Sequence, residues 1–219
     1  MAIEKVILKD RAAWLRHRMG YIGGSEISAV IGCNPYMDNQ RLFDLKTGRT
    51  RPDDISDKDY VQYGIGAENH LRELFKLDFP QYEVFYEENN SFINDKYPWA
   101  AASLDGWLLE KETGRRGVLE IKTTNILQSM QKEKWDNRIP QNYYCQVLFY
   151  MAVTEADFAI LKGQLKTVFG DMPYLQTKHY YIERTAEVQA DIDYIMTAGA
   201  QFWDDVKAGK RPPLLLPEL

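Results

Sequence analysis

The spacing of apolar residues changes in the middle of this chain, and that change restricts the folds open to it. Residues 63–77 carry apolar side chains at helical spacing. Residues 83–87, 101–109 and 118–122 instead read as strands separated by polar turns. Helical spacing then returns downstream. We therefore expect an α/β (α+β) protein with a mixed central β-sheet flanked by helices.

Further elements are predicted from helix caps, glycine stops and strand-like runs. The apolar positions of the 63–77 helix are Ala67, Leu71, Leu74 and Phe75. The other expected elements are a helix from Asp10 to Gly20 with Trp14 and Leu15 inward, a helix after Gly23, a short helix over 42–46, a helix capped by Asn125 that runs to Trp135, a helix from Pro140 to Met151, strands over 158–162 and 180–183, a C-terminal helix over 186–206 and an irregular tail over 211–219.

The composition is typical of one intracellular domain. With 219 residues and 45% hydrophobic content the chain can build one core, so we expect a single domain over 1–219. Two cysteines, Cys33 and Cys145, are too few for a disulfide framework or a zinc cluster. No apolar run suits a bilayer, and residues 1–10 lack the apolar stretch of a signal peptide. We expect a cytoplasmic protein that does not bind membranes.

The net charge of −5 argues against a protein that coats nucleic acid by bulk electrostatics. Any attraction to phosphate must come from bound metal ions or from a local basic patch. One such patch lies near the N-terminus, although charge alone favours an ordinary solvated helix face there. Its members are Lys5, Lys9, Arg11, Arg16 and Arg18.

Two acids and a lysine fall on neighbouring strands of a predicted hairpin. Asp105 and Glu120 are equidistant from a point inside the turn-like run 110–117, so a regular hairpin places them opposite each other. Side chains alternate along a strand, so Glu120 and Lys122 share one face while Ile121 points into the core. The pattern therefore predicts a cluster of two carboxylates and one amine.

Two carboxylates this close repel each other unless a cation lies between them. Mg²⁺ suits the position, because it is bound by one or two carboxylates and keeps several waters; the Ile121 carbonyl can add an oxygen. Lys122 can then orient or deprotonate a metal-bound water and offset charge on phosphorus. By itself, an acid followed at a distance by Glu-x-Lys is more often a surface cluster of ion pairs.

Further polar residues favour a functional site over a surface cluster. Asp105 precedes a glycine, where backbone can approach a ligand closely. Glu68 follows a glycine-rich helix start and is a candidate ligand, direct or through water; alone it would be a solvated helix residue. Gln146 and Tyr150 lie one helical turn apart, so both can face the same site. Core packing of Tyr150 and a surface place for Gln146 are the alternatives.

Four blocks of the chain together resemble the lambda exonuclease and YqaJ-type viral recombinase nucleases of the PD-(D/E)xK superfamily. Leu104 stands where the superfamily motif usually has proline, and residues 163–178 match nothing in the family. The matching blocks are 18–27 with 32–36, 63–75, 103–106 with 119–123, and 146–150.

The resemblance implies a restriction-endonuclease-like core and a site that uses Mg²⁺, with Mn²⁺ as a substitute. The implied metal-binding residues are Asp105, Glu120, Ile121 and Glu68, and the implied catalytic residues are Lys122, Glu120, Asp105, Glu68 and Gln146. The implied 5′-phosphate and DNA-binding residues are Arg18, Ser25 and Tyr150.

The spacing of Arg18 and Ser25 also suggests a pocket for a 5′-terminal phosphate. Arg18 ends one helix, Gly23 and Gly24 let the backbone come close, and Ser25 opens the next helix, whose free N–H groups attract an anion. The planar guanidinium of arginine can grip phosphate with two hydrogen bonds. Alternatively, Arg18 caps the carbonyls of its own helix and Ser25 is only a helix cap.

By resemblance, we expect a 5′-to-3′ exodeoxyribonuclease that degrades one strand of linear duplex DNA for phage recombination by single-strand annealing. A homotrimer, a single-strand annealing protein as partner, and a phage or prophage gene acting in the bacterial cytoplasm are implied in the same way. An endonuclease or nickase of the superfamily is one alternative. A non-catalytic DNA-binding subunit is another, disfavoured because Asp105, Glu120 and Lys122 are all present.

Overall fold

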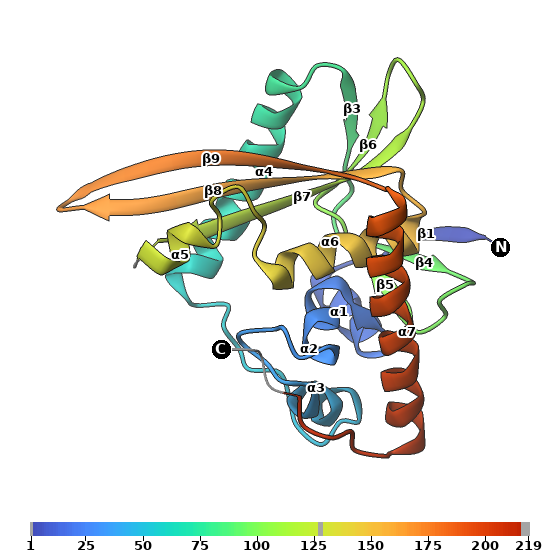
Figure 1. Cartoon of the computed structure of the whole chain (residues 1–219). Helices are drawn as coiled ribbons and strands as arrows, with labels where there is room; N and C mark the ends of the chain where they lie inside the picture. The colour runs from blue at the N-terminus through green and yellow to red at the C-terminus, as the bar shows by residue number, and fades with distance from the viewer. Residues whose placement is uncertain (1, 127–128, 216–219) are drawn as a thin grey trace.

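The computed structural model describes residues 2–126 and 129–215, with the backbone alone at 129 and 130. The described residues form two mixed β-sheets flanked by helices (Figure 1). The smaller sheet has the strand order β1 (Ile3–Ile7), β4 (Asn90–Asn94), β5 (Ala100–Ala102), β2 (Ile22–Gly23). The larger has the order β3 (Tyr82–Phe85), β6 (Gly106–Glu110), β7 (Arg116–Asn125), β8 (Phe158–Phe169), β9 (Met172–Glu183). The predicted mixed α/β class is confirmed, although we expected one central sheet.

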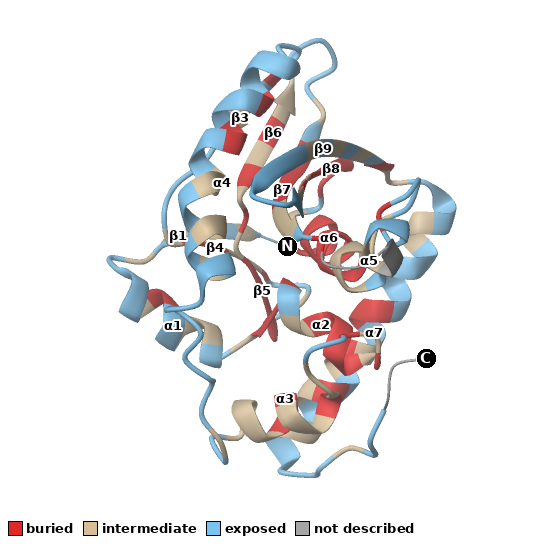
Figure 2. Cartoon of the chain, turned by 90° about the vertical axis from the view of Figure 1, so that its left-hand side faces the viewer, coloured by how far each residue is buried: buried red, intermediate tan, exposed pale blue. Residues whose placement is uncertain are grey.

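The helices are α1 (Arg11–Met19), α2 (Gly24–Val30), α3 (Asn39–Lys46), α4 (Asp59–Asp78), α5 (Ser129–Glu133), α6 (Gln141–Thr154) and α7 (Ala186–Ala208). As predicted, the Asp10 side chain begins α1 by accepting the Ala13 N–H at 2.7 Å. Helix α6 follows β7 in a crossover to the parallel strand β8 and contacts α2, α7 and strands of both sheets. Its buried surface (Figure 2) makes α6 the helix that joins the core to the site.

Two side chains expected in the core are exposed. Leu15 on α1 and Leu74 on α4 both lie on the solvent side of their helices. Their neighbours Trp14 and Phe75 are buried as predicted. In each case one of two adjacent apolar residues takes the inward direction, because consecutive helix positions point about 100° apart.

The strand expected over 101–109 is two strands in different sheets. Residues 103–105 separate β5 from β6, so Asp105 lies at the entry of β6. The register between β6 and β7 pairs Gly106 with Leu119. Continued by one residue, it sets Asp105 opposite Glu120, as the hairpin argument predicted.

The expected helix from Asn125 to Trp135 is mostly absent. Asn125 is the last residue of β7 rather than a helix cap, and α5 covers only 129–133. Residues 127 and 128 lie outside the described residues. The strands expected over 158–162 and 180–183 are much longer than predicted, because residues 163–178 form the outer part of an antiparallel β8–β9 ribbon.

The composition predicted neither a disulfide framework nor a membrane-spanning segment. Cys33 and Cys145 are free thiols whose Sγ atoms lie 3.6 Å apart, although 112 positions separate them. Among the helices of the described residues, none is both long and apolar enough to span a membrane.

Candidate functional site

Asp105, Glu120 and Lys122 meet where β6 begins beside β7. The Oδ2 atom of Asp105 accepts the backbone N–H of Ile121 at 2.8 Å. The Nζ of Lys122 lies 2.6 Å from Oε1 of Glu120, whose side chain is only 2% exposed. Strand alternation puts Glu120 and Lys122 on one face, as predicted, and a buried ion pair joins them. The cluster is therefore not an ordinary surface ion pair.

Helix α6 supplies a polar pair to the same cluster. The Nε2 of Gln146 donates to Oε1 of Glu120 at 2.7 Å and to the Tyr150 hydroxyl at 2.8 Å. Both side chains are buried, so the surface alternative for Gln146 is wrong. Because they lie one turn apart on one face of α6, both side chains point toward the Glu120 carboxylate on β7.

Glu68 reaches the cluster from α4. The guanidinium of Arg72 donates to its Oε1 through both terminal nitrogens, at 3.1 and 3.3 Å. Glu68 is thus neither a freely solvated helix residue nor an unpaired charge. Its carboxylate interacts electrostatically with those of Asp105 and Glu120 across the hairpin.

Burial, followed by the crowding of carboxylates, determines the electrostatics of the site. Burial raises the pKa of Glu120 to about 8, and the Asp105 carboxylate adds to the rise while Lys122 opposes it. Burial and Asp105 likewise raise the pKa of Glu68 to about 7. Burial raises the pKa of Asp105. Burial alone would lower the pKa of Lys122, but Glu120 and Asp105 raise it. Additional positive charge would stabilise the ionised carboxylates.

One carboxylate oxygen of the cluster accepts no hydrogen bond from the described residues. The Oε2 atom of Glu120 is buried and has no hydrogen-bond partner among the described residues. A buried carboxylate oxygen left in this way costs free energy unless a ligand or cation completes it. With Asp105 beside it, this oxygen fits the hard oxygen-ligand set that Mg²⁺ prefers.

Glu68 does not complete a three-ligand metal site with Asp105 and Glu120, all of which the structure describes. Within 2–126 and 129–215, no three side chains of Asp, Glu, His or Cys are arranged to hold a metal ion among themselves. The geometry therefore offers a two-carboxylate site made by Asp105 and Glu120. Such a site still suits Mg²⁺, which commonly keeps several waters.

Arg18 and Ser25 lie on the other side of Tyr150. The Nη2 of Arg18 donates to the Ser25 hydroxyl at 3.1 Å, and its guanidinium lies 4.6 Å from the Trp14 ring centroid. The side chain thus bonds to the next helix, whereas the helix-capping alternative required it to bond to carbonyls of α1. A small cavity of about 20 Å³ lies here, lined by Arg18, Tyr21, Gly23, Gly24, Ala101, Ser103 and Tyr150.

Tyr150 contacts both the cavity and the carboxylate cluster. A Cβ atom at Gly24 would lie 2.2 Å from Cε1 of Tyr150, so only glycine lets α2 approach the ring. The hydroxyl of the same ring accepts from Gln146. Helix α2 has seven residues, so the charge of Arg18, rather than a helix dipole, is the main positive feature of the cavity.

Two residues at the site carry roles that the sequence did not predict. Arg72 is 3% exposed and lies one turn after Glu68, a spacing that could have indicated the ion pair. Tyr143 lies three residues before Gln146 on α6, and its ring centroid is 5.1 Å from Nζ of Lys122. Aromatic residues at helical spacing usually mark a core, so Tyr143 gave no separate signal.

Comparison with known sequences identifies relatives. Residues 13–157 match the model of the YqaJ-like viral recombinase domain, a range that contains all the predicted site residues. The protein YqaJ of Bacillus subtilis (strain 168) is 29% identical over 211 residues, which cover 94% of this chain and 59% of that protein. The chain thus spans less than two thirds of the length of that relative.

Comparison with solved structures identifies the same fold in two exonucleases. An alkaline exonuclease (LHK-Exo) from Laribacter hongkongensis aligns with a TM-score of 0.64 and 20% identity, covering 90% of this chain and 95% of that one. A phage-related exonuclease from Haemophilus somnus 129PT aligns with a TM-score of 0.54 and 14% identity, covering 86% and 96%. At these identities the likeness concerns the fold.

Proposed function

Because the chain belongs to the YqaJ-like viral recombinase domain family, we propose that it is a magnesium-dependent exodeoxyribonuclease that degrades one strand of linear duplex DNA from the 5′ end. The observation that carries this proposal is the Oε2 of Glu120 beside Asp105 and Lys122, which is buried and has no hydrogen-bond partner in the described part of the chain. Two proteins that share the fold are exonucleases by name, which supports the same class of reaction.

Asp105 and Glu120 would hold the magnesium ion, with the Ile121 carbonyl as a further oxygen and Glu68 acting through water. Manganese, which accepts the same oxygen ligands, should substitute. When bound, the ion would polarise the scissile phosphate and lower the pKa of a water. The Ile121 N–H keeps Asp105 oriented, and Arg72 keeps Glu68 oriented.

Lys122 has the central role among the protein groups. Its ammonium lies 2.6 Å from Oε1 of Glu120. There it would orient the attacking water and offset negative charge that develops on the phosphate oxygens. Gln146 fixes the Glu120 carboxylate by donating to Oε1, which leaves Oε2 for the cation. Tyr150 positions Gln146 and forms one wall of the neighbouring cavity.

Arg18 and Ser25 would bind the 5′-terminal phosphate of the digested strand. The cavity beside Arg18 extends to Ser103, two residues before Asp105. A phosphate at Arg18 would therefore set the distance between the strand end and the carboxylates. This arrangement favours cleavage from an end, because an internal phosphodiester has no terminal phosphate for the pocket.

The resemblance extends the proposal to assembly and biological role. We propose a homotrimer around DNA that acts with a single-strand annealing protein in recombination, in the cytoplasm of a host carrying the phage or prophage. A ring would retain DNA despite the net charge of −5. Light scattering with DNA present should give the mass of three chains plus the bound DNA; a mass of one chain, with or without DNA, would contradict this part of the proposal.

Digestion of linear duplex labelled at the 5′ end of one strand, beside covalently closed circular DNA, tests the function. We expect magnesium-dependent release of the 5′ label as the first product from the linear substrate, while the circle stays intact. Cleavage of the circle would indicate the endonuclease or nickase. Binding of DNA without cleavage would indicate a non-catalytic subunit.

A further inference from the structure

Tyr143, which lies beside Lys122, and two neighbouring tyrosines take no part in the proposed chemistry. The ring centroid of Tyr143 lies 5.1 Å from Nζ of Lys122. Burial raises the pKa of Tyr36, and the nearby phenols of Tyr143 and Tyr60 add to the rise. Tyr36 is 82% exposed and Tyr60 is 56% exposed. We call these three residues the tyrosine cluster. Tyr143 is the member beside Lys122, and Tyr36 and Tyr60 are the members exposed to solvent.

The most exposed ring of the cluster is on a firmly held loop. The side-chain amide of Asn34 donates to the Ser28 hydroxyl at 3.0 Å, and its Oδ1 accepts the backbone N–H of Tyr36 at 2.8 Å and of Met37 at 3.1 Å. Asn34 itself is buried. A large apolar ring held in water by a buried anchor costs free energy, and preorganised aromatic rings are typical of binding surfaces.

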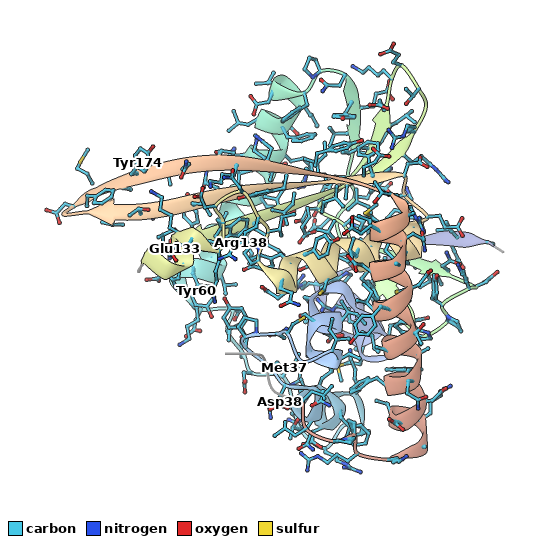
Figure 3. The ribbon with its side chains drawn as sticks, in the orientation of Figure 1. Met37, Asp38, Tyr60, Glu133, Arg138 and Tyr174 are labelled. Atoms are coloured by element: carbon cyan, nitrogen blue, oxygen red, sulfur yellow. The ribbon has the colours of Figure 1, made fainter. Side chains whose placement is uncertain are left out.

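A groove with two cations adjoins the cluster. It encloses about 680 Å³, and its wall includes Pro35 and Asn142, the chain neighbours of Tyr36 and Tyr143. Lys134 and Arg138 also line it. Figure 3 shows Arg138 on the same side of the molecule as Tyr60 and Met37. Positive charge and exposed aromatic rings thus lie together in a chain that is acidic overall.

We propose that the tyrosine cluster is a stacking platform for the bases of unpaired DNA, whose phosphates lie along Lys134 and Arg138. The proposal rests on the proposed function, since a nuclease that degrades one strand of a duplex meets unpaired nucleotides next to its site. Every base has a π-face, so tyrosine rings bind single strands with little regard to sequence. Bases inside a duplex are already stacked and cannot use the rings in this way.

Binding without cleavage tests the platform. The affinity of a short fluorescein-labelled oligothymidylate is measured by anisotropy in EDTA, for the wild type and for Tyr36→Ala. We expect Tyr36→Ala to weaken binding about fivefold or more, the usual loss for one stacked base. Tyr36→Phe keeps the ring and should bind as the wild type does. Tyr174→Ala removes another exposed ring, 57% accessible to solvent, from the β8–β9 ribbon (Figure 3) and should have no effect.

A second comparison separates base stacking from charge. An abasic oligonucleotide of the same length should bind Tyr36→Ala and the wild type equally. Replacing Lys134 and Arg138 by glutamine should weaken binding of both oligonucleotides and reduce the salt dependence, by a slope of about 0.7 for each phosphate that the protein no longer neutralises. Equal affinity of Tyr36→Ala and the wild type for oligothymidylate would overturn the platform, as would failure of the wild type to bind.

The two proposals fail separately. The same protein preparations are assayed for magnesium-dependent cleavage of linear duplex. If the wild type cleaves duplex and Tyr36→Ala binds oligothymidylate as tightly as the wild type, only the stacking platform is contradicted. If the wild type binds oligothymidylate through Tyr36 but does not cleave duplex, the proposed nuclease activity is contradicted and the platform is supported.

Discussion

Both terminal nitrogens of the Arg72 guanidinium donate to a single carboxylate oxygen of Glu68, with Nη1 at 3.3 Å and Nη2 at 3.1 Å. Arg72 is almost wholly buried, and its Cζ lies 3.5 Å from the ring centroid of Tyr86. The planar guanidinium is thus held at its face by the aromatic ring and at its edge by the carboxylate. Arg72 is therefore a positioning residue for Glu68.

Arg72→Ala should impair the use of magnesium more than it impairs catalysis at saturating metal. Without Arg72, Glu68 loses its orientation, so more metal should be needed for half-maximal activity. Unfolding should also become easier by about 1–3 kcal/mol, the usual cost of a buried polar group that loses its partner. Arg72→Lys keeps the charge but not the paired hydrogen bonds. Its magnesium requirement and its stability should lie between those of the wild type and of Arg72→Ala.

Lys76→Ala is the matched control for Arg72 on the same helix. Its ion pair with Glu73, at 2.7 Å, is solvent-exposed on both sides. Removing it should change stability by less than about 1 kcal/mol and leave the metal dependence of cleavage unaltered. A metal dependence for Arg72→Ala that equals that of Lys76→Ala would contradict the positioning role.

Lys122→Ala should slow the chemical step while leaving metal affinity largely in place. The ammonium is expected to stabilise charge in the transition state, and loss of such a donor typically costs about 10²–10³ in kcat. Single-turnover cleavage at several magnesium concentrations separates the two effects. Lys207→Ala, an exposed lysine on α7, serves as the control. A fall in metal affinity as large as the fall in rate would refute this role.

Gly24→Ala should destabilise the protein by about 1–3 kcal/mol, because its new methyl group would overlap the Tyr150 ring and force the surrounding core to shift. Gly66→Ala, in α4, meets nothing within 4 Å and should be neutral or stabilising by up to about 1 kcal/mol. Thermal unfolding of the two variants compares them directly. A Gly24→Ala protein as stable as the wild type would show that Tyr150 can move away from α2.

Arg18→Ala should lose the preference for 5′-phosphorylated ends over 5′-hydroxyl ends while some basal cleavage remains. The reason is that Arg18 is the cation of the cavity beside Tyr150. Initial rates on two duplexes that differ only in the terminal phosphate measure the preference. If the variant discriminates between the two ends as strongly as the wild type, the phosphate binds elsewhere.

The register of the metal hairpin was predictable because it depends on local geometry alone. Two positions equidistant from a turn face each other, and alternate residues of a strand share a side, so the sequence alone could bring Asp105, Glu120 and Lys122 together. The ion pair of Arg72 with Glu68 was also predictable, since the two residues stand at helical spacing. No long-range information was needed for any of these relationships.

Other features depend on contacts that a single sequence does not display. The break at 103–105 exists because the preceding strand β5 pairs with β4 and β2 in a second sheet. Residues 163–178 form a ribbon whose outer part is exposed, so alternation of apolar and polar residues is weak there. The gathering of Tyr36, Tyr60 and Tyr143 likewise joins three separate elements and leaves no periodic signal.

Cleavage of 5′-phosphorylated linear duplex by Glu120→Gln shows whether Glu120 binds a catalytic magnesium ion. The amide keeps the size of the side chain and an oxygen for Gln146 but lacks the charge. We expect the wild type to cleave only with added magnesium, and Glu120→Gln to be inactive at every magnesium concentration while unfolding at a temperature no lower than that of the wild type. Asp105→Ala should be inactive as well. Magnesium-dependent cleavage by Glu120→Gln at the wild-type rate would show that Glu120 is not a required ligand, and wild-type cleavage that persists in EDTA would show that no magnesium ion is needed.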